Sequence, residues 1–366
     1  MVDHVNELTG SREYDAKGNL IKEQFLNGHA LTSEYDDMGR RIKLTLPDQS
    51  NIYYKWGPKY LDEIQRITSK ERFNYRHRFI QYNMAGFPTK QRLSEGFGEL
   101  SFEMDSTLTI VAKKTRMQNQ TDENSSSNKN RNITKDPINY TYHHDGLGRI
   151  TEVVKPYQKI LFTYDIWNRR MSKRILDKID GEWTESLHLS FLYDDQKEIG
   201  AIDEEEIWLK QLKICAPHLV NPGDQAVAYE LEGRPYIAIH DLEGNVQDLY
   251  SILRGKLMET YAYSDEGVDQ VFDYWNQKIS YSKAKNPWRF QCERLDEETG
   301  LYFTGGRYYD PIKGEFITPS IDPDVLATKT WNQRGLLTLS LPEYPEVEQA
   351  KPNWERGFPL PSLPKS

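Results

Sequence analysis

Two aspartates near the C-terminal end of the chain are the residues whose type and spacing could support catalysis. Asp310 and Asp322 lie close together in the sequence, and Arg307 precedes them. Two carboxylates brought together can share one proton, as they do in aspartic proteases, and a nearby guanidinium favours the charged member. The simpler alternative is that Asp310 caps a turn and Asp322 belongs to an ordinary Asp-Pro bend.

Metal and cofactor chemistry finds less support in the sequence. His143 and His144 are adjacent, so on a strand they would point to opposite faces. The acidic stretch 194–206 lacks the glycine that a calcium-binding EF-hand needs at its sixth position, where Ile199 stands, and it is predicted to be a solvated acidic loop. The chain has no GxSxG motif, no glycine-rich phosphate loop and no HExxH motif. We therefore predict no metal site and no cofactor.

The composition favours a folded, tyrosine-rich protein. The chain has 366 residues and a mean hydropathy of -0.78, yet 12% of it is aromatic, with 23 Tyr. Disordered chains are poor in aromatic residues. The formal net charge of -9 argues against nucleic acid as the main partner, because phosphate binding needs concentrated Lys and Arg. Only local basic pairs occur, such as Arg169 with Arg170.

The sequence also indicates the state of the cysteines and the cellular location of the protein. Cys215 and Cys292 have no zinc spacing and are predicted to be two buried free thiols. No run of residues approaches the roughly 20 apolar residues of a membrane-spanning helix. The first residues lack the basic and apolar regions of a secretory signal. We expect a cytoplasmic protein, or one exported by a signal-independent route.

A degenerate repeat that begins with Tyr-Asp runs through most of the chain. In each copy Gly or Asn stands three residues after Asp, and an apolar residue follows. The Asp side chain can start a turn by accepting a hydrogen bond from the backbone two residues on, and Gly supplies the positive φ of a short hairpin loop. The repeat positions are Tyr14, Asp15, Gly18, Tyr35, Asp36, Gly39, Asp145, Gly148, Tyr164, Asp165, Asn168, Asp241 and Gly244.

Successive hairpins predict an all-β fold of antiparallel β-hairpin repeats that form one continuous ribbon. The copies at Tyr14 and Tyr35 are 21 residues apart, which leaves room for two strands and their turns. His144 and His240 stand where the repeat has Tyr, so we expect them to pack against neighbouring strands. Residues 60–67 show apolar residues at helical spacing, although a strand is equally compatible with them.

From residue 286 the sequence changes character and becomes rich in aromatic residues. Its distinctive positions are Pro287, Trp288, Arg289, Phe290, Gly300, Leu301, Arg307, Tyr308, Tyr309, Asp310, Pro311 and Gly314. Asp310, Pro311 and Gly314 predict a tight turn. Together with the Tyr-Asp units, this segment resembles the repeat-associated core of Rhs/YD-repeat proteins, a group that includes toxin-complex shell components and teneurins. The resemblance covers roughly residues 10 to 323.

The resemblance implies part of a coiled β-ribbon shell, and in toxin members of the family that shell encloses a C-terminal effector. It also implies a core that cleaves itself with aspartates, for which Asp310, Asp322 and Arg307 are the candidates. This chain departs from the pattern, because no Gly-Leu follows Asp322-Pro323. We therefore expect no enzyme, but a truncated or degenerate C-terminal shell piece of an Rhs-type polymorphic toxin without its own toxin domain. Self-cleavage, and binding of a carbohydrate or cell surface, stay open as alternatives.

The domain organisation and partners follow from the same patterns. We predict two repeat segments, residues 1–117 and 138–285, joined by an Asn/Ser-rich linker or loop at residues 118–137. A core segment at residues 286–323 and a Pro-rich extended tail at residues 324–366 follow. The exposed strand edges of a partial wall invite pairing with another chain. The expected partners are other shell segments or a larger Rhs-type chain, with a cell-surface carbohydrate or protein as a further possibility, and no nucleic acid.

Overall fold

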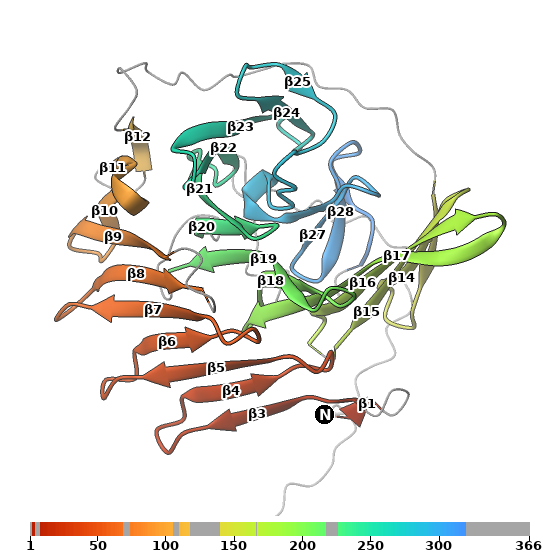
Figure 1. The fold of residues 1–366 in the computed structure, drawn as a ribbon, viewed down its shortest axis with the longest axis horizontal. Coiled ribbons are helices and arrows are strands. Elements are labelled where there is room, and N and C mark those ends of the chain that lie inside the picture. Colours follow the sequence, from red (N-terminus) through yellow and green to blue (C-terminus); the bar gives the residue numbers. More distant parts are fainter. Residues whose placement is uncertain are drawn as a thin grey trace, which may run out of the picture.

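The structure is a computed structural model, and it consists almost entirely of antiparallel β-strands (Figure 1). It describes residues 2–3, 8–68, 74–104, 110–117, 140–165, 167–216 and 226–319. The all-β fold class and the ribbon of consecutive hairpins are confirmed, because within each of the larger sheets every strand pairs with the next one along the chain. The predicted linker 118–137, the tail 324–366 and Asp322 lie outside the described residues.

The first sheet has ten strands in sequence order. They are β3 (Ser11–Tyr14), β4 (Leu20–Gln24), β5 (Ala30–Tyr35), β6 (Arg41–Thr45), β7 (Asn51–Trp56), β8 (Leu61–Ile67), β9 (Asn74–Tyr82), β10 (Pro88–Arg92), β11 (Gly98–Met104) and β12 (Ile110–Met117), with the 3-10 turn η1 (Ser94–Gly96) between β10 and β11. The segment with helical spacing is therefore strand β8. A two-stranded sheet, β1 (Val2–Asp3) with β2 (Leu8–Thr9), precedes this sheet.

The second sheet has thirteen strands, again in sequence order. They are β13 (Thr141–His144), β14 (Ile150–Val154), β15 (Gln158–Tyr164), β16 (Arg170–Ile179), β17 (Glu182–Asp194), β18 (Lys197–Asp203), β19 (Trp208–Cys215), β20 (Ala226–Leu231), β21 (Arg234–His240), β22 (Val246–Ser251), β23 (Lys256–Tyr263), β24 (Asp269–Asp273) and β25 (Lys278–Ile279). The core segment adds the turn η2 (Phe290–Cys292) and four short strands, β26 (Arg294–Asp296), β27 (Leu301–Thr304), β28 (Arg307–Asp310) and β29 (Glu315–Phe316).

The hairpin turns are held by the Asp side chains of the repeat. Asp15 Oδ1 accepts backbone hydrogen bonds from Lys17 at 2.8 Å and from Asn19 at 2.9 Å. The residue three positions on, Gly18, has a φ of 87°, a value that L-amino acids with side chains rarely adopt. The same pair of bonds, to the second and fourth residues after the acceptor, recurs at Asp36, Asp145, Asp165, Asp241 and Asp273.

The repeat tyrosines tie each hairpin to the one before it. The Tyr35 hydroxyl donates to the carbonyl oxygen of Leu20, the first residue of β4, at 2.9 Å. Equivalent bonds run from Tyr164 to Ile150, from Tyr193 to Arg170 and from Tyr263 to Val246. Each accepting residue begins a return strand, so the hydroxyl bridges a turn to the next hairpin. This contact explains physically why Tyr precedes Asp in the repeat.

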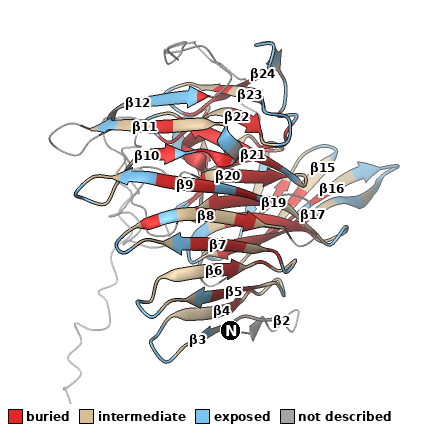
Figure 2. Cartoon of the chain, turned by 60° about the vertical axis from the view of Figure 1, so that its left-hand side comes forward, coloured by how far each residue is buried: buried red, intermediate tan, exposed pale blue. Residues whose placement is uncertain are grey.

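The two larger sheets share one hydrophobic core. Phe25, Leu44 and Ile52 of the first sheet pack in the same cluster as Phe191 and Leu212 of the second. Figure 2 shows buried residues along the strands of both sheets. Ion pairs join the sheets as well, among them Glu23–Arg169 at 2.9 Å, Arg41–Asp194 at 2.5 Å and Arg66–Glu230 at 2.7 Å.

The burial of two histidines and two cysteines can be compared with the predictions from the sequence. His240 is buried, as expected, but His144 is exposed, so that prediction is wrong. His144 lies on β13, which is an edge strand of the second sheet because no other described strand pairs with its outer side. Cys292 is buried, whereas Cys215 is only half-buried. Within the described residues, no helix is long and apolar enough to cross a membrane.

Candidate functional site in the core segment

The core segment lies against the second sheet and forms a further layer over it. Leu301, Phe303 and Tyr308 pack on a cluster from β14, β15 and β16 that includes Ile150 and Phe162. Trp288 packs on a second cluster from β20 to β24 and stacks on Tyr229 with ring centroids 5.1 Å apart. In Figure 1 the blue strands β27 and β28 lie between the two ends of this sheet. The core segment thus bridges strands that are far apart in the sequence.

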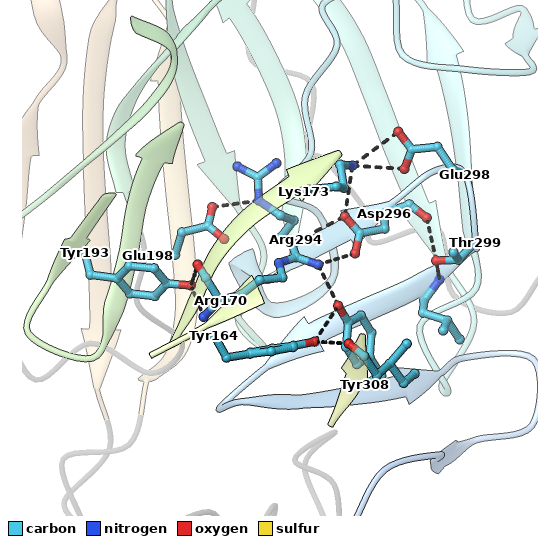
Figure 3. Close-up of polar contacts among 12 residues, drawn as sticks. Tyr164, Arg170, Lys173, Tyr193, Glu198, Arg294, Asp296, Glu298, Thr299 and Tyr308 are labelled. Atoms are coloured by element: carbon cyan, nitrogen blue, oxygen red, sulfur yellow. Dashed lines mark hydrogen bonds and ion pairs between the residues drawn. The ribbon is translucent and has the colours of Figure 1, made fainter. Parts of the chain in front are cut away.

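A buried cluster of charges fastens the core segment to the sheet (Figure 3). Arg170 begins β16 and is fully buried, and its Nη1 lies 2.5 Å from Asp296 Oδ2 on β26. The same nitrogen donates to the Tyr308 hydroxyl at 3.0 Å. The Tyr164 hydroxyl, which is bound to the Ile150 carbonyl oxygen, lies 3.3 Å from that of Tyr308. These contacts join the sheet to both β26 and β28.

Two further cations complete this cluster. Lys173 Nζ lies 3.1 Å from Asp296 Oδ1 and 3.0 Å from Glu298 Oε2. Arg294 Nε lies 2.7 Å from Glu198 Oε1 on β18. Arg170, Lys173 and Arg294 are thus matched by Asp296, Glu198 and Glu298, three cations by three carboxylates. A balanced set is needed here, because an unpaired buried charge is strongly destabilising.

Electrostatics in the cluster favour the charged forms. Burial on its own would raise the pKa of the Asp296 carboxyl, but the positive charges of Arg170 and Lys173 outweigh it and hold the pKa at about 2. The pKa of the Arg170 guanidinium is well above its usual range, because the attraction of Asp296 and Tyr308 outweighs its desolvation. Both groups therefore stay ionised across the physiological range. The pair of Arg170 and Asp296 thus acts as a fixed structural clamp between the sheet and β26.

A second buried network holds the other side of the core segment. Arg289, next to Trp288, forms short ion pairs with Asp269 at the start of β24 and with Glu297. Burial alone would lower the pKa of Arg289, yet Asp269 and nearby Tyr261 raise it above its usual range. Arg289 Nε also donates to the carbonyl oxygen of Asn286 at 3.2 Å. The core motif position Arg289 is therefore part of the attachment to the sheet.

The residues predicted as catalytic candidates lie at the outer end of this segment. Asp310 Oδ1 accepts backbone hydrogen bonds from Ile312 at 2.9 Å and Lys313 at 3.3 Å, and the Gly314 N–H donates to the Asp310 carbonyl oxygen at 2.9 Å. Arg307 lies over the Phe316 ring at 3.9 Å and donates to the Thr318 carbonyl oxygen. Because Asp322 is outside the described residues, its distance from Asp310 is not defined, and the catalytic pair stays a prediction.

Asp310 also lines a pocket of about 150 Å³. Aromatic walls come from Tyr140 and Tyr142, whose ring centroids are 6.5 Å apart. Carboxylates of Asp269, Glu297 and Asp310 supply the polar lining. Burial raises the pKa of Tyr142 to about 12, so its phenol stays protonated and can donate a hydrogen bond. Such a lining can accept and donate hydrogen bonds to a polar ligand that has an apolar face.

The acidic stretch 194–206 is not the solvated loop predicted from the sequence. Its residues 197–203 form β18, in the interior of the second sheet. Two of its carboxylates pair with cations from distant segments, Asp194 with Arg41 and Glu198 with Arg294, which sequence order alone does not reveal. Asp203 pairs with Lys210 of the next strand, and Glu204 contacts His29 of the first sheet. Asp195, Glu205 and Glu206 are exposed. No group of three or more potential metal ligands occurs among the described residues.

Sequence reasoning missed the most deeply buried charges of the site. Arg170 and Lys173 carry no signal in the sequence, except that Arg170 forms a local basic pair with Arg169. Both arginines are buried, and Arg169 pairs with Asp165 at 2.7 Å as well as with Glu23. A basic pair directly after a turn of the repeat, at the start of a long strand, is the available signal.

Comparisons with known proteins give distant matches. No family model matches the chain. The chain is 25% identical over 252 residues to the tRNA3(Ser)-specific nuclease WapA of Bacillus spizizenii, and 24% identical over 252 residues to the tRNA nuclease WapA of Bacillus subtilis strain 168. These matches cover 67% of this chain and 10% of each relative. The chain thus spans about a tenth of the length of the curated relatives it matches.

Solved structures of toxin complexes also resemble the chain. A crystal structure of TcdB2-TccC3-TEV matches 87% of this chain and 21% of its own chain, with 14% sequence identity and a TM-score of 0.41. A TcdB2-TccC3 structure without the hypervariable C-terminal region matches 93% of this chain and 17% of its own, with a TM-score of 0.30. Because these TM-scores are below 0.5, the description of the fold is based on the strand pairing of this chain and not on these structures.

Proposed function

We propose that this chain is a structural and interaction protein, a wall segment of an Rhs-type toxin shell. The single observation that carries the proposal is the attachment of the core segment. Its motif residues Trp288 and Arg289, together with Asp296, are buried against strands of a hairpin ribbon. Buried, neutralised charges in this position hold a wall together, and they offer no group exposed to a substrate.

The comparisons support this proposal at a coarse level. The similarity to the WapA nucleases covers 67% of this chain, which agrees with a shared repeat architecture. Those relatives are named as tRNA nucleases, but the chain matches only about a tenth of their length. We therefore assign the matched part a scaffold role and do not assign it nuclease activity.

Edge strands give the proposal a direct test. In a wall segment, the free edge of β13 should pair with another chain. We expect the sedimentation coefficient of the full chain to rise with concentration. The double variant Thr141→Lys and His143→Lys places charges on exposed positions of β13 and should reduce this association. A wild-type chain that stays monomeric at every concentration would contradict the wall-segment proposal.

Self-cleavage is the rival to a purely structural role, and intact mass distinguishes the two. The proposal requires that the mass of the full chain stays unchanged during storage at neutral and acidic pH. If a fragment cut after Pro323 appears, and Asp310→Asn prevents it, the chain is a self-cleaving core.

A second candidate function, binding of a carbohydrate, is favoured by one observation. The pocket beside Asp310 combines Tyr140 and Tyr142 with three carboxylates, a lining suited to a sugar ring with its hydroxyl groups. Tyr142→Ala should abolish retention on immobilised glycans, whereas Tyr157→Ala, at an exposed tyrosine outside the pocket, should leave retention unchanged. Failure of the wild-type chain to bind any glycan would remove this candidate.

A further inference from the structure

The outer face of the first sheet carries a row of charged side chains that runs across the strands. Six consecutive strands, β7 to β12, contribute one residue each, and every neighbouring pair is in direct cross-strand register. In order across the sheet, the residues are Lys55, Glu63, Arg78, Arg92, Glu99 and Arg116. Opposite charges directly across a strand pair stabilise a sheet, and most of the row follows that rule.

The alternation of charge fails at one place. Arg78 on β9 and Arg92 on β10 are direct cross-strand partners, and both are positive. Like charges in this position are destabilising. Arg76 lies two residues before Arg78, so it points to the same face of β9 and adds a third guanidinium. It is exposed, and it pairs with no carboxylate of the described residues.

The carboxylates on either side neutralise only part of this charge. Glu63 Oε2 lies 2.7 Å from Arg78 Nε on the β8 side. On the β11 side Glu99 serves two cations, with Lys90 at 2.8 Å and Arg92 at 3.0 Å. Among the described side chains of this pocket and its ion pairs, the cations Arg76, Arg78, Lys90 and Arg92 therefore outnumber the carboxylates Glu63 and Glu99.

A pocket lies where the alternation fails. It has a volume of about 270 Å³, and its lining includes Arg76, Arg78 and Arg92, with Leu93 and Gly96 from the turn after β10. Figure 2 shows the neighbouring strands β9, β10 and β11 stacked at this side of the molecule. Guanidinium groups bind the oxygen atoms of phosphate and sulfate in bidentate geometry. An anion placed there would restore the alternation of charge along the row.

We propose that this arginine pocket binds a doubly charged tetrahedral oxyanion, either free phosphate or sulfate or the same group as a terminal ester on a carbohydrate. The excess of cations among the described side chains favours an anion, and the three guanidinium groups of the pocket offer enough donors for a tetrahedral oxyanion. Arg78 and Arg92 would hold it from adjacent strands, and Arg76 would contact it from the side. The site is independent of the core segment, so it adds a ligand-binding surface to the proposed wall segment.

Isothermal titration of the full chain at low ionic strength tests the proposal. The probes are inorganic phosphate, inorganic sulfate and glucose 1-phosphate, with chloride as the reference anion. Arg92→Gln and Arg78→Gln should each weaken phosphate binding by about tenfold or more, because each removes a charge-assisted contact. The matched control is Arg174→Gln, which removes an exposed strand arginine paired with Glu185 in the second sheet, and it should leave the affinity unchanged.

The outcomes separate clearly. Tighter binding of glucose 1-phosphate than of phosphate would identify the source as a phosphorylated carbohydrate, whereas equal affinities would mean that the site recognises the anion alone. The proposal is overturned if the wild-type chain binds none of the three probes, or if Arg92→Gln and Arg174→Gln bind phosphate as tightly as the wild type. Unchanged circular dichroism and unfolding midpoints show that each variant is folded.

Discussion

Arg170 and Asp296 show how this protein tolerates ionised groups in its interior. Each is almost completely buried, and two cations share the one carboxylate of Asp296. Transfer of such groups out of water costs several kcal/mol each, which their attraction offsets only when every charge has a partner. Glu298 provides that partner for Lys173. The cluster therefore specifies where the core segment docks more than it adds to stability.

Removal of one charge from the cluster should destabilise the protein, because its partner is then buried without a counter-charge. Asp296→Asn keeps the shape of the side chain but leaves Arg170 buried without a counter-charge. We expect the free energy of unfolding in urea to fall by about 3 kcal/mol or more. Glu185→Gln, which breaks the exposed pair with Arg174, is the control and should change it by about 1 kcal/mol or less. Equal effects of the two substitutions would contradict a clamp at Asp296.

Two buried histidines give the protein a pH-dependent stability. Burial lowers the pKa of His77 to about 4, although its hydrogen bond with Gln91 acts in the opposite direction, and burial lowers the pKa of His240 well below its usual range. The unfolded chain takes up these protons near pH 6.5, whereas the folded chain does not. Stability from His77 is therefore fully present above pH 6.5 and is lost as the pH falls from 6.5 towards 4.

The size of this effect can be measured in urea at pH 7.5 and pH 5. Linkage predicts a loss of about 2 kcal/mol at pH 5 from His77 alone. His77→Gln should reduce the difference between the two pH values. His143→Gln, at an exposed histidine on β13, should leave the difference as it is in the wild type. If His77→Gln has the same pH dependence as the wild type, the assignment to His77 is wrong.

At the scale of the elements, each hairpin depends on the one that follows it. The turn closes locally through the Asp side chain, and the Tyr hydroxyl of the next hairpin then binds the carbonyl of the residue after that turn. For the first sheet this bond joins Tyr35 to Leu20, and for the second sheet it joins Tyr164 to Ile150. A ribbon built in this way gains order as hairpins are added, which is the behaviour of repeat proteins in general.

Deletion of a single hydroxyl tests this link between hairpins. Tyr35→Phe removes the donor to Leu20 and should lower the free energy of unfolding by about 1 kcal/mol. Tyr14→Phe is the matched control, because Tyr14 is the first tyrosine of the repeat and is more than half exposed. It should have little effect. A loss of similar size in both variants would mean that the hydroxyl bond of Tyr35 contributes nothing specific.

At the scale of the whole molecule, the two sheets do not behave as separate units. Phe25 and Leu44 share a core with Phe191 and Leu212, and buried ion pairs such as Arg66–Glu230 cross between the sheets. Each sheet on its own would expose that apolar face and leave those charges unpaired. The predicted segments 1–117 and 138–285 are therefore expected to fold as one body.

A chain cut between the sheets tests this expectation. A specific protease site inserted among residues 118–139 allows the intact, folded chain to be cut after purification. The two fragments should elute together in size-exclusion chromatography and separate only in denaturant. Arg66→Ala removes one buried ion pair across the interface and should weaken their association. Fragments that separate spontaneously in native buffer would contradict a shared core.

The local structure of the hairpins follows from short-range patterns in the sequence. Asp, Gly and Tyr at fixed spacing predicted the hairpins, because the turn bonds of Asp15 and Asp36 reach only two and four residues along the chain. Short-range patterns of the same kind predicted the all-β fold and the turn at Asp310. They could not place Asp322 beside Asp310, and they misjudged the environment of His144, whose exposure depends on the sheet edge.

Which charges are buried, and which strands contact one another, depends on the tertiary structure. Arg170 and Asp296 are 126 positions apart, and Arg66 and Glu230 are 164 apart. The acidic stretch 194–206 looked solvated because the partners of Asp194 and Glu198 lie on distant segments of the chain. The charge row on the outer sheet likewise depends on cross-strand register. Pairings over such distances form only when the ribbon folds back on itself and brings distant segments of the chain together. Short-range sequence patterns do not predict them.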